Sequence, residues 1–213
     1  EAFQAVLDVY LGKNPSEFTF EGKSYTPMTF LSFTKINPKS YVSITSFTKE
    51  PFYKSFILPI PDNFSNGSFY NLPLDEFVQN IDYALDKGYT LALDCDVSEA
   101  TFSGRFGVAV IPADEVDSKT ILTEIKPEKE ITAEYRQQEF ENLTTQDDHL
   151  MHIVGKVKDQ KGNVYYKVKN SWGTTSGHDG FVYMSVPYLK LKAISVLVHQ
   201  DALTTTTKKV LGL

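Results

Sequence analysis

Two polar residues in the last third of the chain are spaced so that one could control the proton on the other. We predict a strand that begins at His149, a turn over 159–163, and a returning strand over 164–169 that leads to Asn170. Antiparallel pairing would then bring Asn170 near His149 at one end of the hairpin. An imidazole held on one ring nitrogen by a carboxamide oxygen can exchange protons with a third group through the other nitrogen. Trp172 follows closely and could cover this bond from water.

The other metal-binding and nucleophilic side chains do not form a second site of this kind. His152 follows His149 by three residues, so on a strand it should face the opposite side of the sheet. A His-x-x-His pair can bind a metal, but no Cys or carboxylate set completes a site here, and we expect neither a metal nor another cofactor. The single cysteine, Cys95, allows no internal disulfide and no thiol pair for zinc. Its place in a strand-like run predicts a small buried residue.

The elements before the hairpin are predicted by hydrophobic spacing and turn residues. Residues 1–12 show a helical apolar face ended by a glycine, and Thr26-Pro27 begins a second candidate helix. The region 35–73 reads as short strands and long loops. Residues 74–87 form the clearest helix, followed at once by the strand YTLALDCDV. The polar excursion 113–147 contains one further helix, expected over 134–142.

Four strand-like runs after residue 148 predict an antiparallel sheet that closes on itself. The runs are MHIVGKV, VYYKVKNSW, GFVYMSV and AISVLVH, separated by turn-forming residues. The fold class is therefore α+β. We divide the chain into an irregular helix and loop portion over 1–73, a barrel-like sheet half over 74–200, and a C-terminal tail over 201–213.

Length and composition exclude several classes of protein. The 213 residues are 41% hydrophobic, which suffices for a packed core, and no apolar run is long enough to cross a membrane. The net charge of −6 argues against a nucleic-acid binder. The chain starts EAFQAVLDVY without an initiator Met, so we expect a cleaved or truncated product.

An ordered set of motifs resembles a known family. His149 with Gly155, followed after a hairpin by NSWG, resembles the second half of a papain-like cysteine peptidase. The segments LALDCDV, DDHLMHIVG, KVKNSWG and GHDGFVYM, with PSEFTF and YTPMTF upstream, are similar to the bleomycin hydrolase and aminopeptidase C branch. The resemblance covers essentially the whole chain and implies the papain-like cysteine proteinase fold.

The resemblance implies a role for each matching residue. His149 corresponds to the catalytic histidine, Asn170 to the residue that orients it, and Trp172 to the aromatic shield. Asp148 would contribute to the electrostatics around the ion pair. The C-terminal carboxylate, here on Leu213, would bind the free amino group of a peptide substrate. The implied activity is a cysteine-type aminopeptidase that trims peptides from the amino end, in a cage-like homo-oligomer.

The departure from the family pattern concerns the nucleophile. In this family the nucleophilic Cys opens a helix far upstream of the His, together with a Gln of the oxyanion hole, and neither is present here. Cys95 instead matches a strand. We therefore expect the partner of this chain to be a missing N-terminal half that carries the nucleophile, and the chain alone to be inactive. The alternative is a non-catalytic pseudoenzyme or binding domain with the same barrel.

Overall fold

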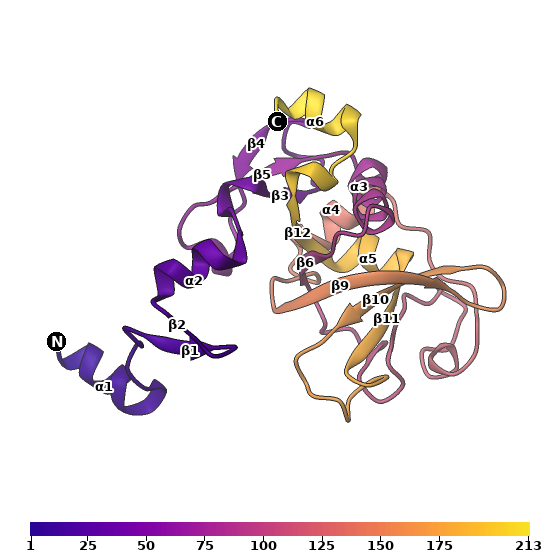
Figure 1. Cartoon of the computed structure of the whole chain (residues 1–213). Coiled ribbons are helices and arrows are strands. Elements are labelled where there is room, and N and C mark those ends of the chain that lie inside the picture. The colour runs from indigo at the N-terminus through magenta and orange to yellow at the C-terminus, as the bar shows by residue number, and fades with distance from the viewer. The chain divides into compact units, whose positions relative to one another are not determined.

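The computed structural model describes all 213 residues and divides into two compact units (Figure 1). Unit 1 comprises Glu1–Lys39, and unit 2 comprises Ser40–Leu213. The boundary lies well before residue 73, where the sequence analysis places one. The reason is strand β3 (Tyr41–Thr45), which pairs along its whole length with strand β12 (Ala193–His199) and so joins this region to the sheet. None of the helices has the length and apolar character needed to cross a membrane.

Unit 1 contains the two predicted helices and a short hairpin. Thr26 caps the second helix: its Oγ1 accepts from the Thr29 backbone N–H at 3.2 Å, and Thr29 Oγ1 accepts from the Thr26 N–H at 2.8 Å. Pro27 takes the first helical position, where its missing N–H costs nothing. The elements are α1 (Ala2–Leu11), β1 (Phe18–Phe20), β2 (Lys23–Tyr25) and α2 (Pro27–Thr34).

Unit 2 is built on one ten-stranded sheet with the order β4-β5-β3-β12-β6-β9-β10-β11-β8-β7. Most neighbours are antiparallel, as the strand pattern predicts, whereas β3 with β5 and β8 with β11 are parallel. The order has two ends, at β4 and at β7, so the sheet does not close on itself as the four strand-like runs after residue 148 predict. The remaining strands are β4 (Ser55–Ile57), β5 (Ser68–Asn71), β6 (Leu91–Cys95), β7 (Phe102–Ser103), β8 (Val108–Ala109), β9 (His149–Lys158), β10 (Val164–Lys169) and β11 (Phe181–Ser185).

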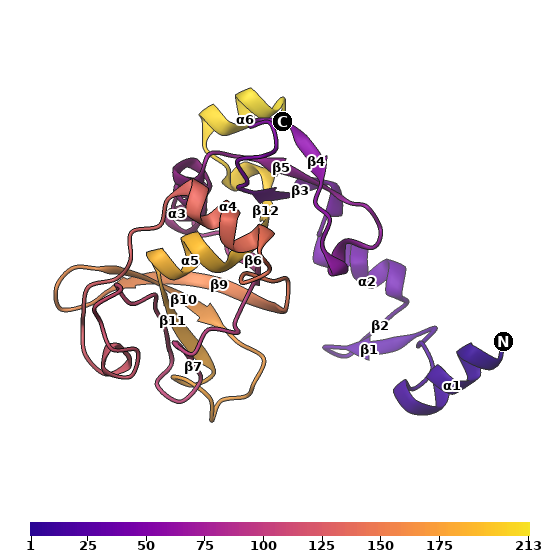
Figure 2. The ribbon, with the colours of Figure 1, turned by 180° about the vertical axis from the view of Figure 1, so that it is seen from behind.

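Three helices gather on one side of strands β9, β10 and β11 (Figures 1 and 2). Helix α3 (Leu74–Asp86) buries the apolar face that its spacing predicts. Helix α4 (Ala133–Glu141) lies within the polar excursion, yet it buries Arg136, which donates to the Ser46 carbonyl at 2.7 Å and to the Lys190 carbonyl at 2.9 Å. Helix α5 (Val186–Lys192) leads directly into β12. The main core lies between these helices and the sheet.

The C-terminal residues form a helix rather than an extended tail. Helix α6 (Thr205–Leu211) is capped by Thr204, whose Oγ1 accepts from the Thr207 N–H at 3.1 Å. Buried Asn80 of α3 makes two hydrogen bonds to the first turn of α6. It donates to Thr207 Oγ1 at 2.9 Å and accepts from the Thr204 N–H at 2.9 Å. These hydrogen bonds attach α6 to α3.

Candidate active site

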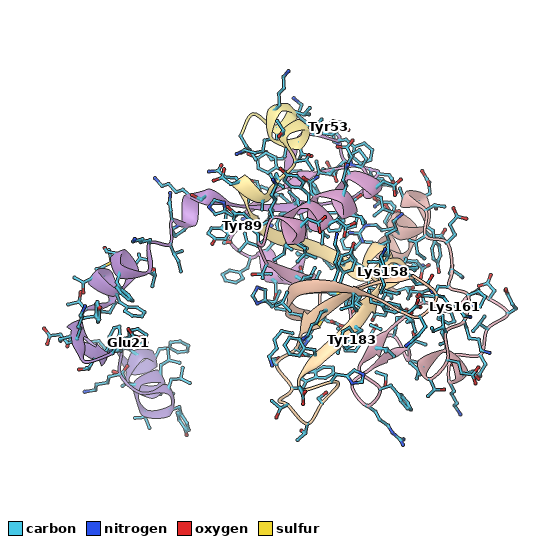
Figure 3. The ribbon with its side chains drawn as sticks, turned by 45° about the vertical axis from the view of Figure 1, so that its right-hand side comes forward. Glu21, Tyr53, Tyr89, Lys158, Lys161 and Tyr183 are labelled. Atoms are coloured by element: carbon cyan, nitrogen blue, oxygen red, sulfur yellow. The ribbon has the colours of Figure 1, made fainter.

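The structure brings together the two residues that open and follow the predicted hairpin. His149 is the first residue of β9, Asn170 follows the last residue of β10, and His149 Nε2 lies 2.9 Å from Asn170 Oδ1. Figure 3 marks the turn of this hairpin with Lys158 and Lys161, at the end of β9 away from His149. The expected proximity of the two side chains is therefore present in the fold.

A β-bulge decides which face of the hairpin Asn170 occupies. The register changes between Lys167 and Val168, because Val154 of β9 has no partner in β10. Side chains alternate between faces along a strand, so one extra residue moves every later partner to the other face. With the bulge, Asn170 is a diagonal neighbour of His149 on the same face. Without it, Asn170 would face away from the imidazole.

The hydrogen bonds of Asn170 fix the proton on the imidazole. Asn170 Oδ1 also accepts from the Ser171 backbone N–H at 2.7 Å, which identifies this atom as the carboxamide oxygen. An oxygen of this type only accepts, so His149 donates from Nε2 and its Nδ1 remains available for proton transfer. Asn170 is 5% exposed, and its Nδ2 is buried without a partner.

Trp172 packs against the imidazole. The two ring centroids are 5.3 Å apart at an interplanar angle of 34°, and Phe102 meets the indole edge-on at 5.7 Å. The indole is 46% exposed, so it forms an outer wall rather than part of the core. A Cβ at Gly104 would come within 3.4 Å of the indole and within 2.9 Å of Ser176 Oγ. A larger residue at position 104 would therefore need the Ser176 side chain to rotate away.

Asp148 is bound to the segment that follows β6 rather than to the imidazole. Its Oδ1 accepts from the Val97 backbone N–H at 3.0 Å, and no hydrogen bond joins it to His149. Burial raises the pKa of Asp148, while the Val97 N–H and His149 act in the opposite direction and Asp96 adds to the increase. The carboxylate is thus placed to anchor the segment that leads into β9.

A buried ion network that the sequence analysis does not identify holds the same segment. Lys192, with a fully buried side chain, lies 2.7 Å from Glu99 and 3.6 Å from Asp96, and donates to the Thr144 carbonyl at 2.9 Å. Asp96 accepts from the Gln146 backbone N–H at 2.7 Å. The only sequence signal for this network is Asp96, a charged residue in a mostly apolar run, because Lys192 closes a helix where lysine is ordinary.

Cys95 is a core residue. It pairs directly with His149 across β6 and β9, but it is fully buried and its thiol donates to the Asp96 carbonyl at 3.4 Å. Burial, with added repulsion from Asp96 and Asp94, raises the pKa of the thiol well above its usual value. A nucleophilic cysteine needs the opposite, a lowered pKa and exposure. Cys95 is therefore the small buried residue that its sequence context predicts.

Leu213 is not brought to His149 by the structure. Cys95 of β6 pairs with His149 on one side and with Ala193, the first residue of β12, on the other, so His149 lies near the start of β12. The chain leaves β12 toward Leu213 from the opposite end of that strand. The C-terminus lies with α6 at the end of unit 2 remote from β9, β10 and β11 (Figure 1). The Leu213 backbone N–H donates to the Lys208 carbonyl at 3.0 Å, which closes α6. The substrate-binding role of Leu213 stays a prediction.

Almost the whole chain is similar to proteins of one peptidase family. Residues 3–212 match the Peptidase C1-like family. Aminopeptidase G of Lactobacillus delbrueckii subsp. lactis is 28% identical, covering 97% of this chain and 48% of the relative. Aminopeptidase C of Lactococcus lactis subsp. cremoris is 27% identical, covering 93% and 47%. The chain thus spans about half the length of the curated relatives it matches.

A solved structure supports the same assignment at the level of the fold. The crystal structure of pepw from Lactobacillus rhamnosis covers 98% of this chain and 48% of its own, with a TM-score of 0.75 at 18% identity. The α+β fold is therefore papain-like. By its matched residues and its fold, the chain belongs to the peptidase C1-like family, in the papain-like branch of aminopeptidase C and bleomycin hydrolase.

Proposed function

We propose that this chain supplies the base half of a cysteine-type aminopeptidase, with a nucleophilic cysteine that lies outside these 213 residues. The observation that carries the proposal is the bond between His149 Nε2 and Asn170 Oδ1, at 2.9 Å with the oxygen also held by the Ser171 N–H. This bond leaves Nδ1 as the nitrogen that can face a thiol. Aminopeptidases G and C among the relatives support peptide substrates trimmed from the amino end.

The mechanism follows from the imidazole and its partner. His149 takes the proton of the incoming thiol, and the resulting imidazolium stabilises the thiolate, whose pKa can fall to roughly 3.5–7.5 in such a setting. The thiolate attacks the peptide carbonyl, and His149 then gives its proton to the leaving amine. Water hydrolyses the acyl-enzyme with His149 acting again as base. Asn170 keeps the ring in one tautomer and one orientation through this cycle.

The same proposal gives the remaining residues their roles. Trp172 limits water at the bond between His149 and Asn170, and Asp148 adds negative charge near the imidazolium. Leu213 is proposed to bind the substrate amino group through its carboxylate, which would need a movement of α6 or a cleft reaching that end of unit 2. The isolated chain is proposed to be inactive, because buried Cys95 cannot serve as the nucleophile.

The test is to find the thiol. The protein would be isolated from its natural source with antibodies against this chain, treated with iodoacetamide, and analysed by intact mass and by aminopeptidase assay. We expect a labelled cysteine other than Cys95, on an accompanying polypeptide or a longer chain, and loss of activity on labelling. A single 24.0 kDa species with no reactive thiol and no activity would contradict the proposal and favour a non-catalytic binding domain.

A further inference from the structure

His149 lies where β9 begins, so strand pairing holds His149 and the residues that follow it but none that precede it. The preceding residues 142–148 connect α4 to β9 and form no helix or strand. The end of a strand opens easily unless other contacts hold it. The position of the imidazole therefore depends on what binds residues 142–148, which we call the entry segment.

Asp96 binds the entry segment from a fully buried position. Its Oδ2 accepts from the Gln146 backbone N–H at 2.7 Å. Its Oδ1 accepts from the backbone N–H and the hydroxyl of Ser98, at 2.7 and 2.6 Å. All of these partners donate, and an ionised carboxylate offers two accepting oxygens and no donor. An Asp at residue 96 therefore matches its surroundings in a way that the amide of Asn would not.

Lys192 binds the entry segment together with the same carboxylate. Its Nζ lies 3.6 Å from Asp96 Oδ2 and donates to the Thr144 carbonyl at 2.9 Å. Both side chains are fully buried, and a buried ion pair is often no more stabilising than apolar side chains of the same volume. This pair binds a C=O and an N–H that lie two residues apart in the entry segment, at Thr144 and Gln146. The pair thus fixes that backbone in one conformation.

The loop that carries Asp96 also supports the aromatic wall of the candidate active site. The Phe102 backbone N–H donates to the Glu99 carbonyl at 2.9 Å, and the Phe102 ring meets Trp172 edge-on at 5.7 Å. The Glu99 carboxylate lies 2.7 Å from Lys192 Nζ. Residues 96–102 therefore connect the entry segment to the ring that packs on the imidazole.

We infer that Asp96 is a positioning residue, which holds the His149 imidazole in line with Asn170 through the Gln146 amide. The inference rests on the reaction proposed above. Asp96 is fully buried and its hydrogen bonds go to Gln146 and Ser98, so it acts through the backbone and does not touch a substrate. In Asp96→Asn, an NH₂ group would replace one accepting oxygen and face a donor at Gln146 or Ser98. The entry segment would then shift, and the imidazole with it.

The first readout is the tautomer of His149, measured by ¹⁵N NMR of the ring in the full 213-residue chain, which needs no peptidase activity. In the wild type, the bond to Asn170 Oδ1 places the proton of the neutral ring on Nε2. We expect Asp96→Asn to show a mixture of the two neutral tautomers. Ser98→Ala is the matched control, because it removes one hydrogen bond from the same carboxylate, leaves the bond to Gln146, and should keep the single tautomer.

The second readout is the rate of the active aminopeptidase that contains this chain. Because a misplacement of about 1 Å can cost about 10²-fold in rate, we expect kcat of Asp96→Asn to fall about ten- to hundredfold while KM changes less than about twofold. A single Nε2–H tautomer in Asp96→Asn would overturn the inference, and so would an unchanged kcat, with or without a rise in KM. If the wild type showed no peptidase activity in any preparation, the proposed function would fail, whereas the tautomer would still decide the role of Asp96.

If Asp96→Asn does not fold, Gln146→Pro replaces it. Gln146 is exposed, and proline removes the N–H that donates to Asp96 while it leaves the buried pair with Lys192 in place. Gln146→Ala is its control, because both variants lose the side-chain bond to the Leu143 carbonyl but only alanine keeps the N–H. We expect a mixture of tautomers in the proline variant alone, and identical ring spectra for the two variants would contradict the inference.

Discussion

At the scale of single residues, the imidazole of His149 is controlled mainly by neutral groups. Its one side-chain hydrogen bond goes to Asn170, and its ring packs against Trp172. Asp148, the adjacent carboxylate, is bound to the Val97 backbone instead. An arrangement of this kind sets the tautomer and orientation of the ring more than it sets a fixed charge.

The role of Asn170 can be measured in the active aminopeptidase. Asn170→Ala removes the acceptor for His149 Nε2, so the ring can rotate and present the wrong nitrogen. We expect kcat/KM to fall about ten- to hundredfold, less than the roughly 10²–10⁴-fold loss for removing His149 itself. Asn163→Ala, at the turn of the same hairpin, is the matched control and should leave the rate unchanged. Full activity of Asn170→Ala would exclude the orienting role.

Asp94 should make the stability of the protein fall as pH rises. Its pKa is about 3.9 in an unfolded chain and about 8 in the fold, so between these values the folded state holds a proton that the unfolded state has released. Stability is therefore full below about pH 4 and declines up to about pH 8. Between pH 5 and pH 9, the free energy of unfolding of Asp94→Asn should rise by on the order of 2 kcal/mol relative to that of the wild type.

Urea unfolding at pH 5, 7 and 9 measures this difference. Asp114→Asn serves as the control, because the Asp114 side chain is 83% exposed and its change should leave the pH dependence of the wild type in place. Parallel stability curves for Asp94→Asn and the wild type would show that the Asp94 carboxyl is not held neutral in the fold.

The residues of the candidate site can be predicted from the sequence, whereas the bulge and the buried contacts that hold them in place cannot. His149, Asn170 and the hairpin between them follow from strand patterns and turn residues, since these signals are local. The unpaired Val154 that turns Asn170 to the correct face leaves no such signal, because a bulge depends on the pairing of two strands. The buried partners of Lys192 come from segments far apart in the chain, so no spacing rule reveals them.

At the scale of elements, helix α5 carries the ion network that fixes the segment before β9. Lys192 is fully buried beside Glu99 and Asp96, so Lys192→Met would leave carboxylates without their cation. We expect a loss of about 3–5 kcal/mol in the free energy of unfolding. The Gln146 amide, which donates to Asp96, should also lose protection from hydrogen exchange.

The same helix offers the control for this experiment. Lys190 pairs with Asp75, whose side chain is 90% exposed, and such a surface pair contributes about 0–1 kcal/mol. Lys190→Met should therefore have little effect on unfolding or on exchange at Gln146. Equal effects of the two substitutions would mean that burial of Lys192 does not stabilise the segment through its charge.

Helices and strands with strong local signals are confirmed, whereas elements that depend on distant contacts are not anticipated. Helix α3 follows from its apolar spacing, and α4 from its composition. Helix α6 is read from sequence only as a polar tail, because four consecutive threonines disfavour a helix. It forms because Thr204 caps it and buried Asn80 binds its first turn.

At the scale of the whole molecule, the division after Lys39 assigns every strand of the large sheet to unit 2. The sequence places the boundary near residue 73, since 35–73 is rich in loop-forming residues. The strands within that region are short, and they gain stability from pairing with β12 at the far end of the chain. Long-range pairing of this kind is invisible to a local pattern.

Two truncated forms of the chain would distinguish between a boundary after Lys39 and one near residue 73. Residues 40–213 keep the whole sheet and both apolar clusters, so this fragment should unfold cooperatively with a Tm within roughly 3 °C of the full chain. Residues 74–213 lose β3, which leaves β12 with an unpaired edge, and lose Phe47, Leu58 and Ile60, which leaves Ile194 uncovered. We expect this shorter fragment to aggregate or to unfold without a sharp transition in calorimetry. A cooperative transition for 74–213 that matches 40–213 would restore the boundary near residue 73 and show that β3 to β5 are an accessory to the fold.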